Sequence, residues 1–275
     1  FFPFRFVLAK SATYDGRRQS YSRPGRAAFA CVVVVFLEWL LLGVNAGAEA
    51  PEVVGKMNFL KSRANKSTLR PVKKHATAKR STLSAYTKRT LGSGNLRAAV
   101  TLPDNEDLNE WLAANTVDFF NEISLLYGLV SDDAAKFTKP GEGFPPGFEY
   151  RWADGVQVTK PMRVSSPEYV DLVLLWTEDQ INNEDIFPVS ETQAFPSEFK
   201  NYVKDIFKRL FRIFAIIYHR HFTTIEKLDA AAHLNTCFKH FMFFVLEFSL
   251  VDEKEMKALK GPCERMMEEY KKQST

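Results

Sequence analysis

The fold is decided by residues 198–222, which read EFKNYVKDIFKRLFRIFAIIYHRHF. Apolar side chains recur there every three or four residues, the spacing that places them on one face of a helix. They are Phe199, Tyr202, Val203, Ile206, Leu210, Ile213, Phe214, Ile217 and Tyr218. The pattern predicts a long amphipathic helix that buries one apolar stripe.

Helical patterns continue on both sides of this segment. Ser166 and Pro167 are suited to the N-cap and the first position of one further helix. The expected helices cover 108–127, 166–180, a segment from about 224, a segment restarting at Asn235 or Thr236 into 238–248, and a charged segment from Asp252 that is interrupted at Gly261-Pro262.

Residues 148–160 read FEYRWADGVQVTK and differ from this helical pattern. Asp154-Gly155 separates two alternating segments, a combination that favours a tight β-hairpin. The expected fold class is therefore all-α, a compact helical bundle with one small β-hairpin.

Length and composition limit the possible architectures. The chain has 275 residues, of which 45% are hydrophobic and 25% charged. These values fit one large domain or one domain with tails and exclude a wholly disordered, collagen-like or disulfide-stapled chain. The three cysteines, Cys31, Cys237 and Cys263, lie far apart and form no CxxC motif. They indicate a reducing compartment.

Charge divides the chain into three parts. Residues 57–91 contain ten Lys or Arg and no Asp or Glu, whereas residues 92–275 contain 20 basic and 29 acidic residues. The basic part has few apolar residues after Leu60, so we expect a flexible regulatory arm over 57–91. Gly92-Ser93-Gly94 then acts as a hinge before a helical domain over 92–275.

Residues 1–56 form an N-terminal extension with two interpretations. An apolar stretch at 27–44 follows four arginines and precedes small residues, the layout of a signal peptide or anchor. Glu38 within that stretch weakens a transmembrane interpretation, and Met57 opens a self-consistent start. An artefactual or dispensable extension is the favoured alternative to a targeting segment.

Two charged surfaces are expected on the helical domain. Lys200, Lys204, Lys208 and Arg212 step by four along one helix, with Arg209 beside them, and Arg forks suit phosphate recognition. On the first helix Glu106, Glu110, Asp118 and Glu122 form an acidic surface beside Trp111, a candidate dock for a basic helix. A merely solvated helix face remains the alternative for the basic line.

No catalytic motif is present in the chain. It has no phosphate-cradling loop, GxSxG or HExxH, and His219 and His221 lie on opposite sides of their helix. His233 and His240 share a face, an arrangement more common in a core than in a metal site. We therefore expect a protein that is not an enzyme.

Four segments of the chain are long and distinctive: LGSGNLRAAVTLPDNEDLNEWLAANTVDFFNEISLLYG from Leu91, YRWADG from Tyr150, KRLFRIFAIIYHRHF from Lys208 and HLNTCFKHFMFFVLEF from His233. Together they resemble the Mob family of kinase activators. MNFL at Met57 also matches the usual start of the family. The resemblance implies a non-catalytic co-activator and scaffold that binds NDR/LATS-type AGC kinases and upstream Ste20-like kinases.

The resemblance also implies roles for particular residues. The basic N-terminal region of the kinase would bind at Glu106, Glu110, Trp111 and Asp118. Phosphothreonine would bind at Lys208, Arg209 and Arg212, and Thr68 and Thr90 match regulatory phosphorylation sites. The implied location is cytoplasmic, with the nucleus and the spindle pole or division site as further locations.

The chain departs from the family at the structural zinc site. The resemblance implies two cysteines and two histidines, but the matching positions are Ala134, Lys139, Ile216 and His221. Because a closed structural zinc site takes four ligands, we expect no zinc and no other cofactor. Phe137 and Phe144 are the hypothesised substitute core for this loop.

Other functions follow from weaker signals. A membrane-anchored or trafficking-related Mob-like adaptor rests on residues 27–44 alone, and a metal-dependent hydrolase rests on the histidines. Nucleic-acid binding through the arm is disfavoured because the helical domain is acidic. We expect no stable membrane insertion of that domain.

Overall fold

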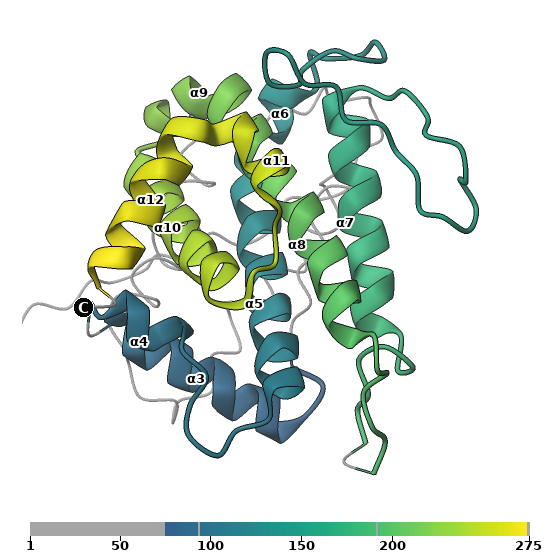
Figure 1. Ribbon diagram of the computed structural model, residues 1–275. Helices are drawn as coiled ribbons and strands as arrows, with labels where there is room; N and C mark the ends of the chain where they lie inside the picture. The colour runs from purple at the N-terminus through teal and green to yellow at the C-terminus, as the bar shows by residue number, and fades with distance from the viewer. Residues whose placement is uncertain (1–74, 93, 191, 274–275) are drawn as a thin grey trace, which may run out of the picture.

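The computed structural model describes residues 75–92, 94–190 and 192–273. Figure 1 shows a bundle in which α5 and α8 run through the middle, with the remaining helices packed around them. The helices are α3 (Ala78–Gly92), α4 (Leu96–Val100), α5 (Leu108–Gly128), α6 (Ser131–Ala134), α7 (Ser166–Asn182), α8 (Phe199–Ile216), α9 (Phe222–Lys227), α10 (Ala231–Phe248), α11 (Glu253–Met256) and α12 (Lys260–Lys272).

The predicted apolar stripe of residues 198–222 is buried in the core except for Tyr202, which is exposed, and Tyr218, which is partly exposed. The core also contains two phenylalanines of α8 that the predicted stripe did not include. Phe207 and Phe211 are fully buried, and Phe207 stacks on Phe241 and Phe244 of α10 with ring centroids 5.2 and 5.5 Å apart. Phe119 of α5 completes the cluster, its ring edge-on to Phe207 at 5.6 Å. Each buried phenyl contributes about 1.5–3 kcal/mol, so these aromatic contacts hold α5, α8 and α10 together.

Helix boundaries follow local sequence signals with small shifts. The N-cap of α7 is Ser165, one residue earlier than expected, and Glu168 completes a capping box with it. Gly261-Pro262 lies in the first turn of α12, where a proline is tolerated, and the interruption falls instead at the 3-10 turn Lys257–Leu259.

The predicted β-hairpin is reduced to a single contact between extended segments. Trp152 and Met162 form one antiparallel bridge with N–H···O distances of 2.9 and 2.8 Å, and the part of the chain that the structure describes contains no strand. Asp154 explains the tight turn, because its side chain accepts hydrogen bonds from the amides of Val156, Gln157 and Val158. The all-α class is confirmed.

The prediction of a flexible arm is wrong for its C-terminal part, because residues 78–92 form α3. Thr77 accepts a hydrogen bond from the Arg80 amide at the start of this helix. Leu83 is buried, and Tyr86 meets the ring of Trp111 edge-on at 6.2 Å. One apolar face against α5, rather than overall composition, is therefore enough to order α3. Residues 57–74 of the predicted arm lie outside the described residues.

The apolar segment 27–44 also lies outside the described residues. Among the helices of the described ranges, none combines the length and hydropathy that crossing a bilayer requires.

Candidate functional site

The acidic surface is formed by α5 and the residues just before it. Asp107 caps the helix by accepting a hydrogen bond from the Glu110 amide at 2.9 Å, which fixes Glu106 and Glu110 at the helix start. Asp118 lies two turns further along. These carboxylates do not face open solvent, because α3 packs along the same side of α5.

Basic residues of α3 pair with the acidic surface one by one. Arg80 Nε lies 2.7 Å from Glu110 Oε2, Lys79 Nζ lies 3.6 Å from Glu106, and Lys88 Nζ lies 3.7 Å from Asp118. His75 Nε2 approaches the same Asp118 carboxylate at 3.2 Å. In this structure, then, a basic helix of the same chain already covers the predicted dock.

Arg80 is the most firmly held of these basic residues. Its side chain is only 2% exposed, and it also donates a 2.7 Å hydrogen bond to the Pro188 carbonyl. The guanidinium lies 5.2 Å from the centroid of the Phe195 ring. An arginine with a carboxylate, a carbonyl and an aromatic face as partners anchors α3 through its first turn.

Asp118 is kept ionised by its basic neighbours. Burial alone would raise the pKa of Asp118, but the hydrogen bond with His75 and the charges of Lys88 and His75 outweigh burial and lower that pKa. A charged carboxylate at this position suits a cationic partner.

Trp111 does not belong to the accessible surface. The side chain is fully buried, and its Nε1 donates a hydrogen bond to the Val100 carbonyl at 3.2 Å. The sequence predicts an exposed acidic rim around this aromatic residue, whereas in the structure Trp111 is buried where α3, α4 and α5 meet. Any effect of Trp111 on binding would act through that packing.

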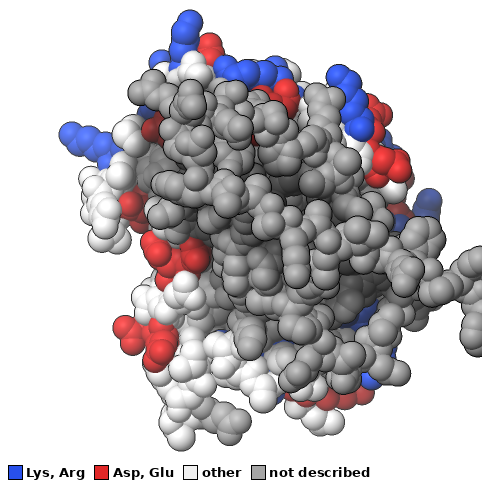
Figure 2. Space-filling view, turned by 180° about the vertical axis from the view of Figure 1, so that it is seen from behind, with Lys and Arg blue, Asp and Glu red and all other residues white. Residues whose placement is uncertain are grey.

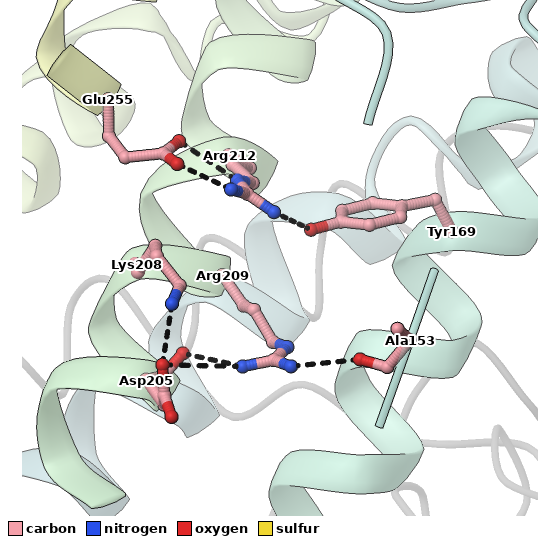
Figure 3. A network of polar contacts seen from close by, with 7 residues as sticks. All are labelled: Ala153, Tyr169, Asp205, Lys208, Arg209, Arg212 and Glu255. Carbon is pink, nitrogen blue, oxygen red and sulfur yellow. Dashed lines mark hydrogen bonds and ion pairs between the residues drawn. The ribbon is translucent and has the colours of Figure 1, made fainter. Parts of the chain in front are cut away.

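The predicted phosphate site on α8 consists of two neighbouring groups of polar contacts, one around Arg212 and one around Asp205 (Figure 3). Arg212 forms two hydrogen bonds to Glu255 of α11, at 3.0 and 2.5 Å, and a third to the Tyr169 hydroxyl at 3.1 Å. Lys208 pairs with Asp205 at 2.5 Å on the outer side of the helix. The three cations are therefore assembled together, each with a partner from the protein itself.

Arg209 is fixed between α8 and the segment that precedes α7. It donates a 3.0 Å hydrogen bond to the Ala153 carbonyl, and its guanidinium lies 4.2 Å from the Trp176 ring centroid. Burial lowers the pKa of Arg209. Burial also opposes the charge on Arg212, but the hydrogen bonds with Glu255 and Tyr169 outweigh it and raise that pKa. The hydrogen bonds with Glu255 explain why the pKa of Arg212 is raised whereas that of Arg209 is lowered.

The remaining lysines of the basic line are not among the residues that make the contacts in Figure 3. Lys200 and Lys204 are exposed, whereas Lys208 has 34% of its side chain exposed. On the face seen from behind in Figure 2, basic and acidic side chains are interspersed along the upper edge. The site is thus confined to Lys208, Arg209 and Arg212.

The sequence matches a known family over most of this domain. The Mob1/phocein family model covers residues 88–259. A "MOB kinase activator-like 1 homolog B" of Dictyostelium discoideum is 51% identical over 197 residues, covering 72% of this chain and 89% of the relative. "MOB kinase activator-like 1A" of Arabidopsis thaliana is 49% identical over 207 residues, covering 75% of this chain and 96% of the relative.

The chain belongs to the Mob1/phocein family. Mob family proteins are activators and adaptors of kinases and are not enzymes themselves. The absence of a catalytic motif in the sequence agrees with this class.

The residues at the expected Mob zinc position do not fit zinc. Ala134 and Ile216 are buried and apolar and have no ligand atom, and Lys139 is exposed. His221 instead pairs through Nδ1 with Asp133 at 2.6 Å. Burial lowers the pKa of His221, although the hydrogen bond with Asp133 opposes this shift. Because a carboxylate accepts hydrogen bonds, Nδ1–H of His221 is the donor. The absence of zinc from this position stays a prediction.

Aromatic packing surrounds the His221–Asp133 pair. The Phe137 ring centroid lies 6.0 Å from that of His221, and the ring of Tyr127 lies at 6.5 Å. Phe144 packs further out, against Tyr150 and Tyr169, and its carbonyl accepts a hydrogen bond from Arg220. Phe137 is thus the aromatic residue beside His221 at the expected zinc position, whereas Phe144 packs in the main core.

Sequence reasoning missed three functional candidates of this Mob domain. Arg80 lies in the segment interpreted as mobile, and Glu255 lies in a helix with no recognised motif. The third is the grouping of Glu122 with His233 and Cys237. The i, i+4 spacing of His233 and Cys237 could have revealed half of that group, but Glu122 is brought there only by the tertiary fold.

Proposed function

We propose that this Mob protein is a non-catalytic co-activator and scaffold for NDR/LATS-type AGC kinases. The basic N-terminal region of the kinase binds the acidic surface of Glu106, Glu110 and Asp118. A phosphothreonine of an upstream Ste20-like kinase, or of a phosphorylated scaffold, binds at Lys208, Arg209 and Arg212. The cytoplasmic, nuclear or division-site location stays a prediction.

One observation carries this proposal: a basic helix already lies on the acidic surface. α3 brings Lys79, Arg80 and Lys88 to three separate carboxylates of the surface. The surface therefore has the shape and charge to bind a cationic helix lengthwise. A kinase helix that takes the same place must displace α3.

The polar contacts on α8 support a second binding role, the recognition of a phosphate group. Arg209 and Arg212 are held in place before any ligand arrives, which lowers the entropic cost of binding. Glu255 occupies the fork of Arg212, so a phosphate would have to share or displace that carboxylate. Lys208, with its partly exposed ammonium, supplies the first contact.

Phosphorylation offers a way to release α3. Thr90 lies in the last turn of α3, where its hydroxyl bonds the Tyr86 carbonyl at 2.9 Å. A phosphate there opposes the negative end of the helix dipole and weakens the helix. Thr68 lies outside the described residues and keeps its proposed regulatory role from the family resemblance.

Calorimetric titration of the full chain with the basic N-terminal region of an NDR-type kinase from the same organism tests the proposal. We expect binding that weakens as salt rises and that Asp118→Lys abolishes. Glu226→Lys, which makes the same charge change on the exposed α9, is the matched control and should bind normally. Equal binding by the wild type and Asp118→Lys would overturn the proposed dock.

A further inference from the structure

Three side chains with different ligand atoms meet between α5 and α10, one turn beyond Asp118 at the end of the acidic surface. Glu122 comes from α5, and His233 and Cys237 come from α10, which packs against it (Figure 1). One ligand atom from each lies within 4.8 Å of the other two. This is the one group of its kind among the residues that the structure describes.

The distance between the two α10 ligands fits chelation. Cys237 Sγ lies 3.6 Å from His233 Nδ1 and 3.5 Å from Nε2. Zinc binds sulfur at about 2.3 Å and histidine nitrogen at about 2.0–2.1 Å, which places the two atoms about 3.6 Å apart at a tetrahedral angle. Their i, i+4 spacing places both side chains on one helix face.

The donor set selects a class of cation. A thiolate, an imidazole and a carboxylate together suit Zn²⁺ or Co²⁺, whereas Mg²⁺ and Ca²⁺ prefer oxygen ligands alone. Cys237 is 2% exposed, while Glu122 and His233 are half-buried, so the thiol is protected and the other two ligands leave a path for entry.

Neighbouring charges and protons modulate this site. Asp118, one turn before Glu122, adds negative charge, and Lys88 of α3 opposes a cation. Burial raises the pKa of Glu122 to about 7 and raises the pKa of the Cys237 thiol above its usual value. A cation must displace these protons, so affinity should rise with pH.

We propose that Glu122, His233 and Cys237 bind one thiophilic divalent cation, best matched by Zn²⁺, at the contact between α5 and α10. The site is distinct from the family zinc position, where His221 pairs with Asp133. Three protein ligands leave a fourth coordination position for water. The ion clips two core helices together and, because the unfolded chain lacks the site, stabilises the folded state.

Cobalt substitution tests this directly in the full chain. The protein is stripped of metal with a chelator and titrated with Co²⁺, while the thiolate-to-cobalt charge-transfer absorption is followed. We expect saturation at one equivalent and loss of the absorption when Zn²⁺ is added. Cys237→Ser should abolish the absorption, and Cys263→Ser, at a buried cysteine on α12, should keep it. Cys31→Ser should also keep it.

A second pair of variants covers the case in which Cys237→Ser fails to fold. Glu122→Gln and His233→Gln should each weaken Co²⁺ binding by more than tenfold with an unchanged circular-dichroism spectrum, whereas Asp133→Asn should not. Zinc should raise the melting temperature of the wild type and of Cys263→Ser. The proposal is overturned by a wild type without thiolate absorption, or by equal binding in the wild type and in the Glu122 and His233 variants.

Discussion

The charged groups of the acidic surface on α5 and of the basic surface on α8 have partners in different parts of this Mob domain. The carboxylates on α5 are neutralised by α3, a helix on the outside of the bundle that is attached through a short turn. The cations on α8 pair with the carboxylates of Asp205 and Glu255 and donate hydrogen bonds to the Tyr169 hydroxyl and the Ala153 carbonyl, all parts of the helical domain itself. The first surface can therefore be uncovered by moving one helix, whereas the second is preformed.

This difference suits the acidic surface to regulation and the basic surface to recognition of a ligand. Because α3 covers the acidic surface partly through ion pairs, its position responds to charge changes such as phosphorylation or a competing basic helix. A network held by the core keeps its geometry and is suited to select one shape of ligand.

Removing the Arg80 side chain, which anchors α3 over the acidic surface, should have the largest effect on the docking of α3. Arg80→Ala leaves Glu110 and the Pro188 carbonyl without their partner, so the docking of α3 should weaken by about 3–5 kcal/mol. Hydrogen exchange of α3 amides should accelerate by about 100-fold or more, and the kinase peptide should bind more tightly.

Lys88→Ala is the matched control for Arg80→Ala. Lys88 is about half exposed in its pair with Asp118, and such pairs contribute about 0–1 kcal/mol. Equal acceleration in both variants would show that α3 is not anchored through its first turn.

Acid should weaken the core beneath the acidic surface. Burial lowers the pKa of His240 from 6.5 to about 4, although the nearby charge of Asp118 opposes this shift. As pH falls from about 6.5 to about 4 the unfolded chain gains a proton that the folded state refuses, so stability decreases by on the order of 3 kcal/mol. Urea unfolding at several pH values measures this.

His240→Gln should remove most of that pH dependence. His219→Gln, at an exposed histidine of the π-helical turn Ile217–His221, should keep it. An unchanged slope in His240→Gln would assign the pH dependence to other groups.

The preformed surface can be tested with a substitution that preserves charge. Arg209→Lys loses the fork that bonds Ala153 and the stacking on Trp176, which together stabilise by about 1–2 kcal/mol. Phosphothreonine peptide binding should fall by about tenfold. Lys204→Arg, on the exposed side of α8, should leave the affinity unchanged. Normal peptide affinity in Arg209→Lys would separate phosphate binding from this network.

A charge at the end of α3 should have the smallest effect. Thr90→Glu places a negative charge in the last turn of α3, where the helix dipole disfavours it by about 0.3–1 kcal/mol. Kinase peptide affinity should increase by two- to fivefold. Thr90→Gln separates charge from size and should leave the affinity unchanged. Weaker peptide binding in Thr90→Glu would contradict release of α3.

The sequence predicts the core because the signal is local. The stripe from Phe199 to Tyr218 specifies α8 on its own, and similar spacing specifies α5. The helix α3 is not predicted, because the many basic residues of 57–91 outweigh the signal of a short apolar face at Leu83 and Tyr86. Its charges become tolerable only when α5 provides their partners, which is a tertiary effect.

The candidate sites show the same limit. The line of Lys208 and Arg212 is visible from spacing, but Glu255, the partner of Arg212, lies 43 residues beyond it in the chain. Trp111 follows an acidic pattern that suggests a surface, yet α5 lies at the centre of the bundle and buries most of its circumference. Residue spacing identifies which groups share a helix face, not which other helix covers that face.

The turn between α3 and α4 has a consequence for any competing partner. Gly94 adopts a φ of +80°, and its amide bonds the Leu91 carbonyl, so α3 is linked to the rest of the domain through a tight reversal. When α3 detaches it stays tethered, and a short tether gives an effective concentration in the millimolar range. A kinase helix in solution thus competes with the tethered α3. The observed affinity of the kinase helix reports the difference between the binding free energies of the two helices.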